Sequence, residues 1–411
     1  MKKPHYAWVI CACGALTLFC LAGLSVTAFS VFQPYLVSQS GLTNAQSSTV
    51  LTVRNLFSFA ALFFVTAFNR RLGLRASIAL SVLGEAVGFV LYALADCFAL
   101  YCAGAAVVGL TYTLGGITAT SLLLSRWFHA HRSLALGICS AGTGFCSILL
   151  PPLLTPVIQD ISLQAAFMIT AAFLVVSGVL LAVLVRDDPQ QKGLQPLGVE
   201  AEETARRSVP AAQRALSRGG MGVMCAAMLL LGLSTGPGPS HLSILYSSEG
   251  FSGDQVALLI SVFGAFLLLG KCLLGQLADK FGAREATFSF YLLTTAGFGL
   301  CCLAGSGSMY AAVSSVVVLG FGVSIAALSS SLFAAEMVPS GQYASAVRTF
   351  QLVFTLGNLS ASSLPGIVAD LTGSYISSFA GFAVLTALSM VAVQLGYRSL
   401  KSKDSPIAHR E

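Results

Sequence analysis

The stretch Gly275-Gln-Leu-Ala-Asp279-Lys280-Phe-Gly282-Ala-Arg284 lies between two long apolar runs. A partial copy lies 209 positions earlier, where Gly73 corresponds to Gly282 and Arg75 to Arg284. The same offset places Gly41-Leu42-Thr43 with Gln46 on Gly250-Phe251-Ser252 with Gln255. Two separate motifs related by one offset indicate that the chain is a duplicated unit. A repeat of this size in so apolar a chain favours a membrane carrier over a channel or an enzyme.

The composition places most of the chain in a membrane. Of the 411 residues, 9% are charged and 56% are hydrophobic, whereas soluble domains are about 25% charged. A membrane-spanning helix needs about 20 mostly apolar residues. Twelve such runs are predicted, at 8–32, 47–68, 74–95, 98–125, 133–157, 162–185, 219–245, 254–277, 285–304, 308–334, 343–367 and 373–396.

The basic residues predict the orientation. On this map 20 of the 22 lysines and arginines fall in segments predicted to be cytoplasmic, none falls in a predicted outer loop, and Arg54 and Lys271 lie inside spans. Because basic loops stay on the cytoplasmic side, we expect a multi-pass protein of the cytoplasmic (inner) membrane with both termini cytoplasmic. The net charge of +6 is therefore a topology signal, and no nucleic-acid partner is expected. The first run is too long for a signal peptide and lacks a clear cleavage site, so it is expected to remain as the first span.

Four regions are predicted along the chain. Residues 1–185 and 219–396 are expected to form two six-helix bundles, joined by a polar cytoplasmic linker at 186–218 that could include a short surface helix around 200–216. Residues 397–411 are expected to form a disordered cytoplasmic tail. All eleven cysteines fall in or at the ends of spans, without metal-ligand spacing. They are expected to be small core residues, so neither a metal nor another cofactor is predicted.

Lys271 is the most informative charge inside a predicted span. A cation at mid-membrane costs about 2.5–3.5 kcal/mol, so it requires a function or a partner. Lys271 lies eight residues before Asp279, or about 12 Å along a helix, and shares its helix face with Gly264 and Gly275. No acidic residue lies one turn away, and the repeat position holds Leu62. We expect the ammonium to bind a substrate carboxylate; a structural ion pair with another helix is the alternative.

Other polar residues inside the spans are weaker candidates. Arg54 either extends to the outer surface or faces the cavity and attracts anions. Glu85 in span three is expected to form a buried structural pair, with proton coupling as the alternative. His241 follows two prolines in span seven; it either binds substrate or titrates near neutral pH, or is a satisfied core histidine. Tyr112 in span four and Asn358 in span eleven could orient a small acid.

The loop motif predicts a gate. Asp279 can accept hydrogen bonds from a neighbouring helix N-terminus and pair with an arginine across the bundle, which would hold the cytoplasmic side closed. Gly73 and Gly282 permit the tight turn between helices. Arg70 occupies the position of the aspartate in the first half, so the contact is expected to be missing or inverted there. The residues predicted to take part in gating are Gly275, Asp279, Lys280, Gly282, Arg284 and Arg126.

Four stretches carry a resemblance to a known family. Arg126-Trp127-Phe128-His-Ala-His-Arg132-Ser-Leu134-Ala135-Leu-Gly137-Ile138 resembles the span 4–5 region of the oxalate/formate antiporter and monocarboxylate transporter branch of the major facilitator superfamily. Tyr6-Ala7-Trp8-Val9 is similar to the opening of that branch, and Pro189, Lys192-Gly193 and Pro196 to its linker. The loop at 275–284 matches the loop between the second and third helices of each half in these transporters. The resemblance implies an all-α membrane protein, with twelve transmembrane helices in two pseudo-symmetric six-helix bundles (the major facilitator fold).

Three departures from the branch bear on the substrate. Gly270-Lys271 stands where those carriers have Gly-Arg, whose arginine binds the substrate carboxylate, so the charge is kept but the bidentate fork is lost. The second cation expected in span eleven of oxalate exchangers is absent, around Leu356. The first-helix lysine of animal monocarboxylate carriers is replaced, with Thr27 as the candidate position. One central cation suits a monoanion better than a dianion such as oxalate.

We therefore predict a secondary active transporter that moves a small organic anion, a monocarboxylate in the first place, by alternating access. It would act as a functional monomer among membrane lipids, either as an exchanger or as a symporter with protons. The predicted substrate contacts are Lys271, Tyr112, His241, Arg54, Thr27 and Asn358.

Three other functions are possible for such a chain: a carrier of neutral compounds, a membrane sensor and an enzyme. A carrier of neutral or amphipathic compounds, with Lys271 in a structural pair, is the alternative. A membrane sensor would typically have a large soluble output domain, which neither linker nor tail provides. An enzyme is disfavoured because the sequence shows no nucleophile–base pair, metal cluster or phosphate loop.

Overall fold

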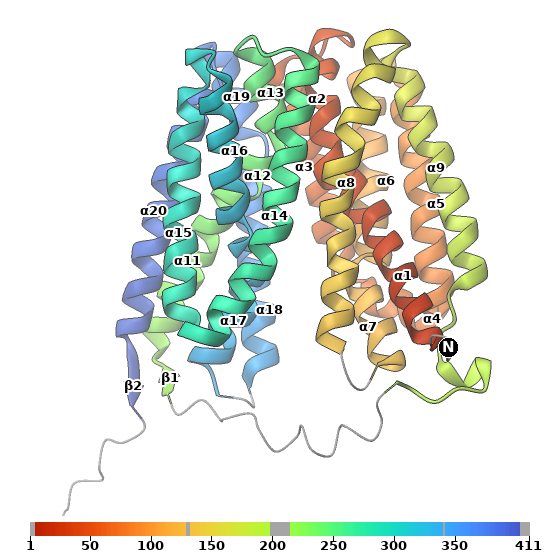
Figure 1. Cartoon of the computed structure of the whole chain (residues 1–411), viewed down its shortest axis with the longest axis vertical. Helices are drawn as coiled ribbons and strands as arrows, with labels where there is room; N and C mark the ends of the chain where they lie inside the picture. The colour runs from red at the N-terminus through yellow and green to blue at the C-terminus, as the bar shows by residue number, and fades with distance from the viewer. Residues whose placement is uncertain (1–4, 129–131, 198–213, 340–341, 403–411) are drawn as a thin grey trace, which may run out of the picture. The chain divides into compact units, whose positions relative to one another are not determined.

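The computed structural model describes residues 5–128, 132–197, 214–339 and 342–402, and these residues are almost entirely helical (Figure 1). Among them, eleven helices are long and apolar enough to cross a membrane, and one bent helix pair brings the number to twelve. The prediction of twelve spans therefore holds when that pair is taken as one span.

In the first half, the first span is continuous from Tyr6 to Ser38 and contains a π-helical segment, η1. The bounds are α1 (Tyr6–Leu18), η1 (Phe19–Ala28), α2 (Phe29–Ser38), α3 (Asn44–Ala61), α4 (Val65–Leu72), α5 (Leu74–Ala93), α6 (Phe98–Gly115), α7 (Ile117–Trp127), α8 (Arg132–Asp160) and α9 (Leu163–Leu184).

The linker contributes a short 3₁₀ turn, and the second half resumes with a strand. The bounds are η2 (Pro189–Lys192), β1 (Arg214–Leu216), α11 (Arg218–Thr235), α12 (Pro237–Ser240), α13 (Leu242–Ser248), α14 (Gly253–Phe281), α15 (Ala283–Cys301), η4 (Cys302–Ser306), α16 (Met309–Val323), α17 (Ile325–Met337), α18 (Tyr343–Ala361), α19 (Leu364–Thr372), α20 (Ile376–Arg398) and β2 (Leu400–Ser402).

Several spans are broken where the sequence predicts continuous helices. Span two bends by 64° between α3 and α4, because the N–H groups of Leu62, Phe63 and Phe64 bond three residues back instead of four. Span seven breaks at Pro237, where a proline cannot continue the backbone hydrogen bonds. Hydrophobicity alone shows the length of a span and not these interruptions.

The repeated Gly-apolar-Thr/Ser motif begins one helix in each half. Gly41 and Gly250 have φ of 68° and 89°, which glycine adopts without strain. In the first copy, the Thr43 and Gln46 side chains bond to each other's backbone N–H groups at 3.1 and 3.0 Å. Ser252 and Gln255 make the same capping box at 3.3 and 2.9 Å. The 209-residue offset thus relates two helix N-termini that have the same glycine turn and the same capping box.

The described residues fall into two compact units. Unit 1 comprises residues 1–208, 239–265 and 362–375, and unit 2 comprises 209–238, 266–361 and 376–411. In unit 1, α5 packs against α6 and α9, and α1 against α8; in unit 2, α15 packs against α16 and α20, and α11 against α18. These helix pairs correspond to one another at the 209-residue offset, which supports the duplication. The division into bundles at 1–185 and 219–396 stays a prediction.

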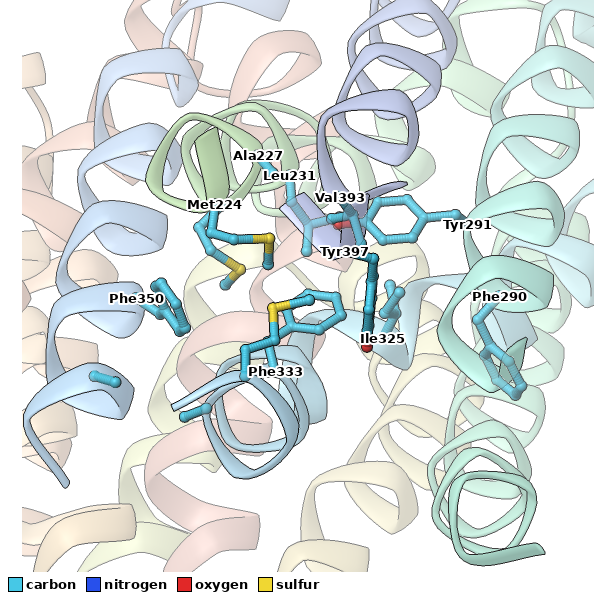
Figure 2. Close-up of a cluster of buried hydrophobic side chains, with 14 of the residues drawn as sticks. Met224, Ala227, Leu231, Phe290, Tyr291, Ile325, Phe333, Phe350, Val393 and Tyr397 are labelled. Atoms are coloured by element: carbon cyan, nitrogen blue, oxygen red, sulfur yellow. The ribbon is translucent and has the colours of Figure 1, made fainter. Parts of the chain in front are cut away.

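Unit 2 has a buried core where α11, α15, α17, α18 and α20 meet (Figure 2). Met224, Phe333 and Phe350 pack there with 0% exposure. The Tyr291 and Ser389 hydroxyls lie 3.0 Å apart in the same region, and Ser389 donates to the Ala227 carbonyl at 2.8 Å. Since lipid is as apolar as these side chains, close packing and such polar contacts stabilise the core.

The tail and linker differ in part from the prediction. Leu400–Ser402, expected to belong to a disordered tail, pairs as β2 with β1 in antiparallel register. The pairing supplies hydrogen-bond partners to backbone groups at the end of α20 and before α11. Residues 214–216 of the expected surface helix form β1, and the rest of it, within 198–213, lies outside the described residues.

Candidate substrate and gating sites

Lys271 lies in the part of α14 that belongs to unit 2, and it is partly buried. Next to it, a Cβ added at Gly270 would lie 2.8 Å from the Phe321 carbonyl oxygen, so glycine lets α14 contact α16 closely. The rings of Phe266 and Phe321 meet edge to face at 5.0 Å. This packing determines how α14 presents Lys271.

The two glycines predicted to leave space beside Lys271 differ in whether the space next to them is empty. A Cβ added at Gly275 would meet no atom within 4 Å, so this position is open. A Cβ at Gly264 would clash with Ser147 of α8. For Gly264 the expectation of open space is therefore wrong, because this glycine serves helix packing within unit 1.

Asn358 lies where α18 packs on α11 in unit 2. A Cβ added at Gly236 would clash with the Asn358 side chain, and one at Gly232 with the Phe354 carbonyl. The structure thus places Asn358, which is partly buried, beside the end of α11.

Arg54 lies inside unit 1 and is 4% exposed, which does not fit one of the two alternatives for it, extension to the outer surface. Its Nη1 donates to the Ser25 carbonyl in η1, and its Nε and Nη2 donate to Asn55 Oδ1 at 3.3 and 3.0 Å. A Cβ at Gly109 would clash with the Arg54 carbonyl, so α3 and α6 are in backbone contact at this level. Burial and these bonds explain why the side chain does not reach the surface.

Glu85 and Tyr112 belong to the same polar region of unit 1. Glu85 is 0% exposed, and neither of its carboxylate oxygens has a hydrogen-bond partner among the described residues. Tyr112 is partly buried on α6, which packs against the α5 helix that carries Glu85. Glu85 makes no salt bridge within 4 Å with Arg54 or another cation in the described part of the chain, and the structural pair expected for it stays a prediction.

His241 belongs to a cluster at the predicted outer end of unit 1, here called the outer cluster (Asn44, Ala45, Ser48, His241, Asp370 and Tyr375). His241 is 0% exposed, with Nε2 2.9 Å from Ser48 Oγ and its ring 6.1 Å from that of Tyr375. This bond matches the expectation of a satisfied core histidine.

Asp370 joins α19 to the N-terminus of α3 in the outer cluster. Its carboxylate accepts from Asn44 Nδ2 at 2.9 Å and from the Ala45 N–H at 2.8 Å. The Tyr375 hydroxyl donates to Asn44 Oδ1 at 3.1 Å. Burial, followed by the charge of Asp370, raises the pKa of Tyr375 above its ordinary value. Sequence analysis did not single out Asp370, since its partners lie more than 300 residues away.

The residues of the loop motif that the structure describes lie within unit 2. Gly282 has φ of 91°, which confirms that glycine makes the turn. Arg284 Nε donates to Gln394 at 3.0 Å, and its guanidinium lies 5.5 Å from the centre of the Tyr397 ring, so it ties α15 to α20. Lys280 is exposed, 5.2 Å from the centre of the Phe281 ring. The side chains of Asp279 and Thr27 are not among those that the structure describes.

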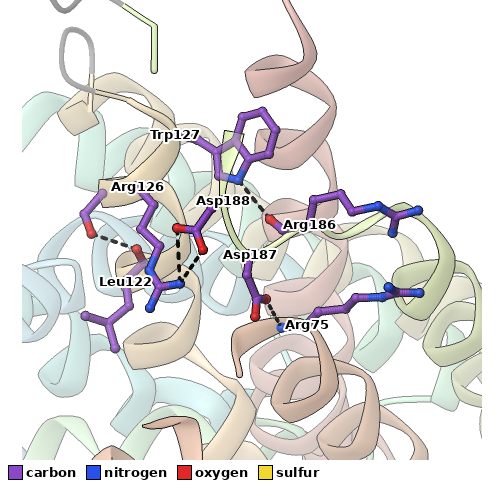
Figure 3. A network of polar contacts seen from close by, with 8 residues as sticks. Arg75, Leu122, Arg126, Trp127, Arg186, Asp187 and Asp188 are labelled. Atoms are coloured by element: carbon purple, nitrogen blue, oxygen red, sulfur yellow. Dashed lines mark hydrogen bonds and ion pairs between the residues drawn. The ribbon is translucent and has the colours of Figure 1, made fainter. Parts of the chain in front are cut away.

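In the first half, the acid comes from the linker (Figure 3). Asp187 accepts from the backbone N–H of Arg75 at 2.6 Å, at the start of α5. Gly73, with φ of 79°, makes room for it, since a Cβ there would lie 2.6 Å from Asp187 Oδ2. Asp188 pairs with Arg126 at 3.3 Å, and both side chains are nearly half exposed. An acid therefore meets the positive end of the α5 dipole, although Arg70 occupies the loop position.

Three of the four stretches that carry the family resemblance meet in unit 1. Trp127 Nε1 donates to the Arg186 carbonyl at 2.9 Å, and the Trp127 ring lies 5.5 Å from that of Tyr6. Trp8 meets Phe128 at 5.4 Å, and Lys192 Nζ lies 5.0 Å from the centre of the Tyr6 ring. The opening, the span 4–5 stretch and the linker thus form one contact region.

The model of the Major Facilitator Superfamily matches residues 15–249 and 223–410, so the chain belongs to this superfamily. It is a multi-pass membrane transporter of the major facilitator fold and not an enzyme.

Among known proteins, the chain is similar to monocarboxylate transporter 12 of Mus musculus, with 23% identity over 92% of this chain and 83% of the relative. It is also similar to monocarboxylate transporter 11 of Homo sapiens, with 27% identity over 76% and 67% of the two chains. Among solved structures, the nucleoside transporter NupG matches with a TM-score of 0.75 at 14% identity, covering 96% of this chain and 99% of that one. A D-xylose–proton symporter matches with 0.71 at 13% identity, covering 97% and 98%. These two structural matches show the fold alone.

Proposed function

We propose that this protein is a secondary active carrier that moves a small organic anion, a monocarboxylate in the first place, across the cytoplasmic membrane by alternating access. Lys271 is the observation that supports the proposal most. It is a cation inside an apolar 29-residue helix, next to a glycine that packs that helix on α16. The similarity to proteins named monocarboxylate transporters points to the same substrate class.

The energetics favour an anionic partner for Lys271. A cation at mid-membrane costs about 2.5–3.5 kcal/mol, and a hydrogen bond to a charged group contributes about 1.5–3 kcal/mol. One carboxylate therefore offsets most of the cost. A second carboxylate on the substrate would need another cation, which favours a monoanion.

The other predicted substrate contacts fall into two groups, according to the hydrogen bonds that they make. We propose Tyr112, Asn358 and Thr27 as polar contacts that orient the substrate. Arg54 and His241 bond to Ser25, Asn55 and Ser48, so we propose structural roles for them in place of direct substrate contact. The loop from Gly275 to Arg284 and the Arg126 contact remain proposed gating elements of a monomer with cytoplasmic termini.

The test is uptake of radiolabelled L-lactate into proteoliposomes. Lys271→Gln keeps a polar side chain of similar length and removes the charge. Losing about 1.5–3 kcal/mol of substrate binding corresponds to a roughly 10–150-fold loss of uptake efficiency. Lys192→Gln, in the exposed η2 turn, is the matched control and should transport as wild type.

Two outcomes decide against the proposal. If Lys271→Gln takes up lactate and other monocarboxylates as wild type does, Lys271 is not the substrate contact. The wild type could instead prefer an uncharged compound to anions, and Lys271→Gln could carry that compound equally well. The protein would then be a carrier of neutral or amphipathic compounds, with Lys271 in a structural pair. Thermal-shift screening of mono- and dicarboxylates supports the choice of substrate, because a ligand at 100 times its Kd stabilises by about 2.7 kcal/mol.

A further inference from the structure

We propose that the predicted outer end of unit 1 has a second binding site for a small monocarboxylate, in which Ser243 and Tyr35 donate hydrogen bonds to the carboxylate at the N-terminus of α14. The site begins at Gly253, eighteen residues before Lys271 in the same helix. It would hold the anion as it enters or leaves on the outer side. The choice of ligand rests on the proposed function, whereas the cavity and its donors do not.

A cavity of about 120 Å³ lies within unit 1, where α2, α8, α13 and α14 meet. The residues of its wall that bear on binding are Tyr35, Ser38, Gln159, Ser243 and Gly253. A water molecule takes up about 30 Å³ in the liquid, so the space suits about four waters or one molecule as small as acetate or lactate. Among the described residues no charged side chain lines the cavity. A ligand would therefore be held by hydroxyl groups, an amide and the end of a helix.

Ser243 brings to this cavity a hydrogen-bond donor that the described residues leave unused. Its side chain is 1% exposed and lines the cavity, and its Oγ has no hydrogen-bond partner in the described part of the chain. A buried hydroxyl without a partner is unfavourable, and most buried polar side chains in proteins are hydrogen-bonded. An acceptor atom of a bound molecule would satisfy the Ser243 hydroxyl.

Tyr35 contributes a second donor, and Gln159 fixes its position. Gln159 Nε2 donates to Tyr35 Oη at 3.3 Å. Because the Tyr35 oxygen accepts this bond, its own O–H can donate to an acceptor in the cavity. A Cβ added at Gly253 would clash with Gln159 and lie 2.7 Å from Tyr35 Oη. Glycine thus lets the first residue of α14 lie directly against this pair.

The start of α14 favours an anion over a cation. This helix is 29 residues long, and the first N–H groups of a helix carry a positive partial charge that attracts carboxylates. Asp254 in the first turn is exposed and does not line the cavity, so water and salt screen its charge. Two hydroxyl donors and a positive helix end suit a single carboxylate. A dianion would need a cation that the lining of this cavity does not offer.

The walls of the cavity are already in contact with one another. Ser261 of α14 donates to the Ile148 carbonyl of α8 at 3.0 Å, and a Cβ added at Gly264 would clash with Ser147 of the same helix. Helix α2 packs against both α13 and α8. A site whose walls are in place before binding loses little entropy when the ligand arrives.

Protection from thiol labelling tests the site in the purified chain. Cys97 and Cys272, which are both exposed, are replaced by serine, and Ser38→Cys then places a thiol on the exposed part of the cavity wall. L-Lactate at about ten times its Kd should slow the reaction of this thiol with a maleimide about tenfold, because about one site in ten stays empty. Gln39→Cys is exposed at the next position and outside this cavity. It is the matched control and should react at the same rate with and without lactate.

Two variants test the donors. Ser243→Ala should raise the lactate concentration for half protection by at least about tenfold, which corresponds to about 1.4 kcal/mol. Gly253→Ala, which fills the space against Gln159 and Tyr35, should have the same effect and serves if the first variant does not fold. Half protection of Ser243→Ala at the wild-type concentration would overturn the proposal. Equal protection by lactamide, the uncharged analogue, would overturn the carboxylate as the ligand.

Lys271→Gln separates this site from the one in the proposed function. Lactate should still protect Ser38→Cys when Lys271 is changed to glutamine, and a loss of protection there would contradict a separate site. If lactate protects Ser38→Cys but the wild type does not transport it, the proposed function fails and the outer site stands. If lactate is transported in a way that depends on Lys271 but never protects Ser38→Cys, the outer site fails and the proposed function stands.

Discussion

Asp370→Ala should open the predicted outer end of unit 1. The carboxylate accepts two hydrogen bonds at the start of α3, from Asn44 at 2.9 Å and from Ala45 at 2.8 Å. Loss of an N-terminal helix cap costs about 0.5–2 kcal/mol, and Asp370 is exposed, so solvent screening keeps the effect within that range. A loss of about 0.5–2 kcal/mol changes a two-state ratio by roughly 2–30-fold.

The change can be measured by thiol labelling. Ser47 on α3 is 0% exposed, so Ser47→Cys reports opening near the outer cluster. Cys97 and Cys272, which are both exposed, are first replaced by serine. A membrane-impermeant maleimide should label this cysteine roughly 2–30 times faster in Asp370→Ala. Asp370→Asn keeps one acceptor oxygen and should give an intermediate rate.

The labelling experiment needs a control for the loss of an exposed carboxylate. Asp160→Ala removes another exposed carboxylate at the same predicted end and should leave the labelling rate unchanged. If Asp370→Ala labels within twofold of that control, the two hydrogen bonds do not hold the outer cluster closed, and the reasoning from cap energies is wrong.

Three further predictions concern stability, each measured by thermal unfolding in detergent. Gly109→Ala should destabilise unit 1 by about 1–3 kcal/mol, because its Cβ would clash with the Arg54 carbonyl; Gly299→Ala, in a helix with open space at that position, is the control, and equal melting temperatures would contradict the prediction. Gly282→Ala should cost about 1–2 kcal/mol, since its φ of 91° strains any other residue; a stability equal to that of Gly299→Ala would show that the turn rearranges freely. Asp187→Ala should cost about 0.5–2 kcal/mol through the lost contact at the start of α5, whereas Asp188→Ala should cost less than about 1 kcal/mol because its pair with Arg126 is exposed; the reverse order would refute this assignment.

The local features of the fold could be predicted well. Apolar runs predict the spans, the 209-residue offset predicts the paired helix starts at Gly41 and Gly250, and Gly282 predicts a positive-φ turn. All of these depend on residues close together in the chain. Hydrophobic length and backbone geometry are properties that short segments possess on their own.

The sites were less predictable. The sequence marked Lys271, Arg54, Glu85 and Tyr112 as unusual for a membrane, but it predicted neither the direction of Arg54 nor the lack of hydrogen-bond partners for Glu85 among the described residues. Because Arg70 occupies the loop position, the sequence predicted that the first-half contact would be missing or inverted, whereas the structure brings Asp187 to the start of α5 from beyond α9.

By itself, the sequence determined the class of protein, the positions of the apolar spans, the internal duplication and the presence of a cation in span eight. Only the tertiary structure decided the 64° bend in span two, the partners of Arg54, the contact of Asp370 with α3, and the full burial of Glu85. The physical reason is that a charged residue inside an apolar run can be recognised from the residues next to it in the chain. The partners of that charge depend on which helix faces meet in the fold. Those faces are brought together by close contacts such as Gly109 on Arg54, between residues far apart in the chain.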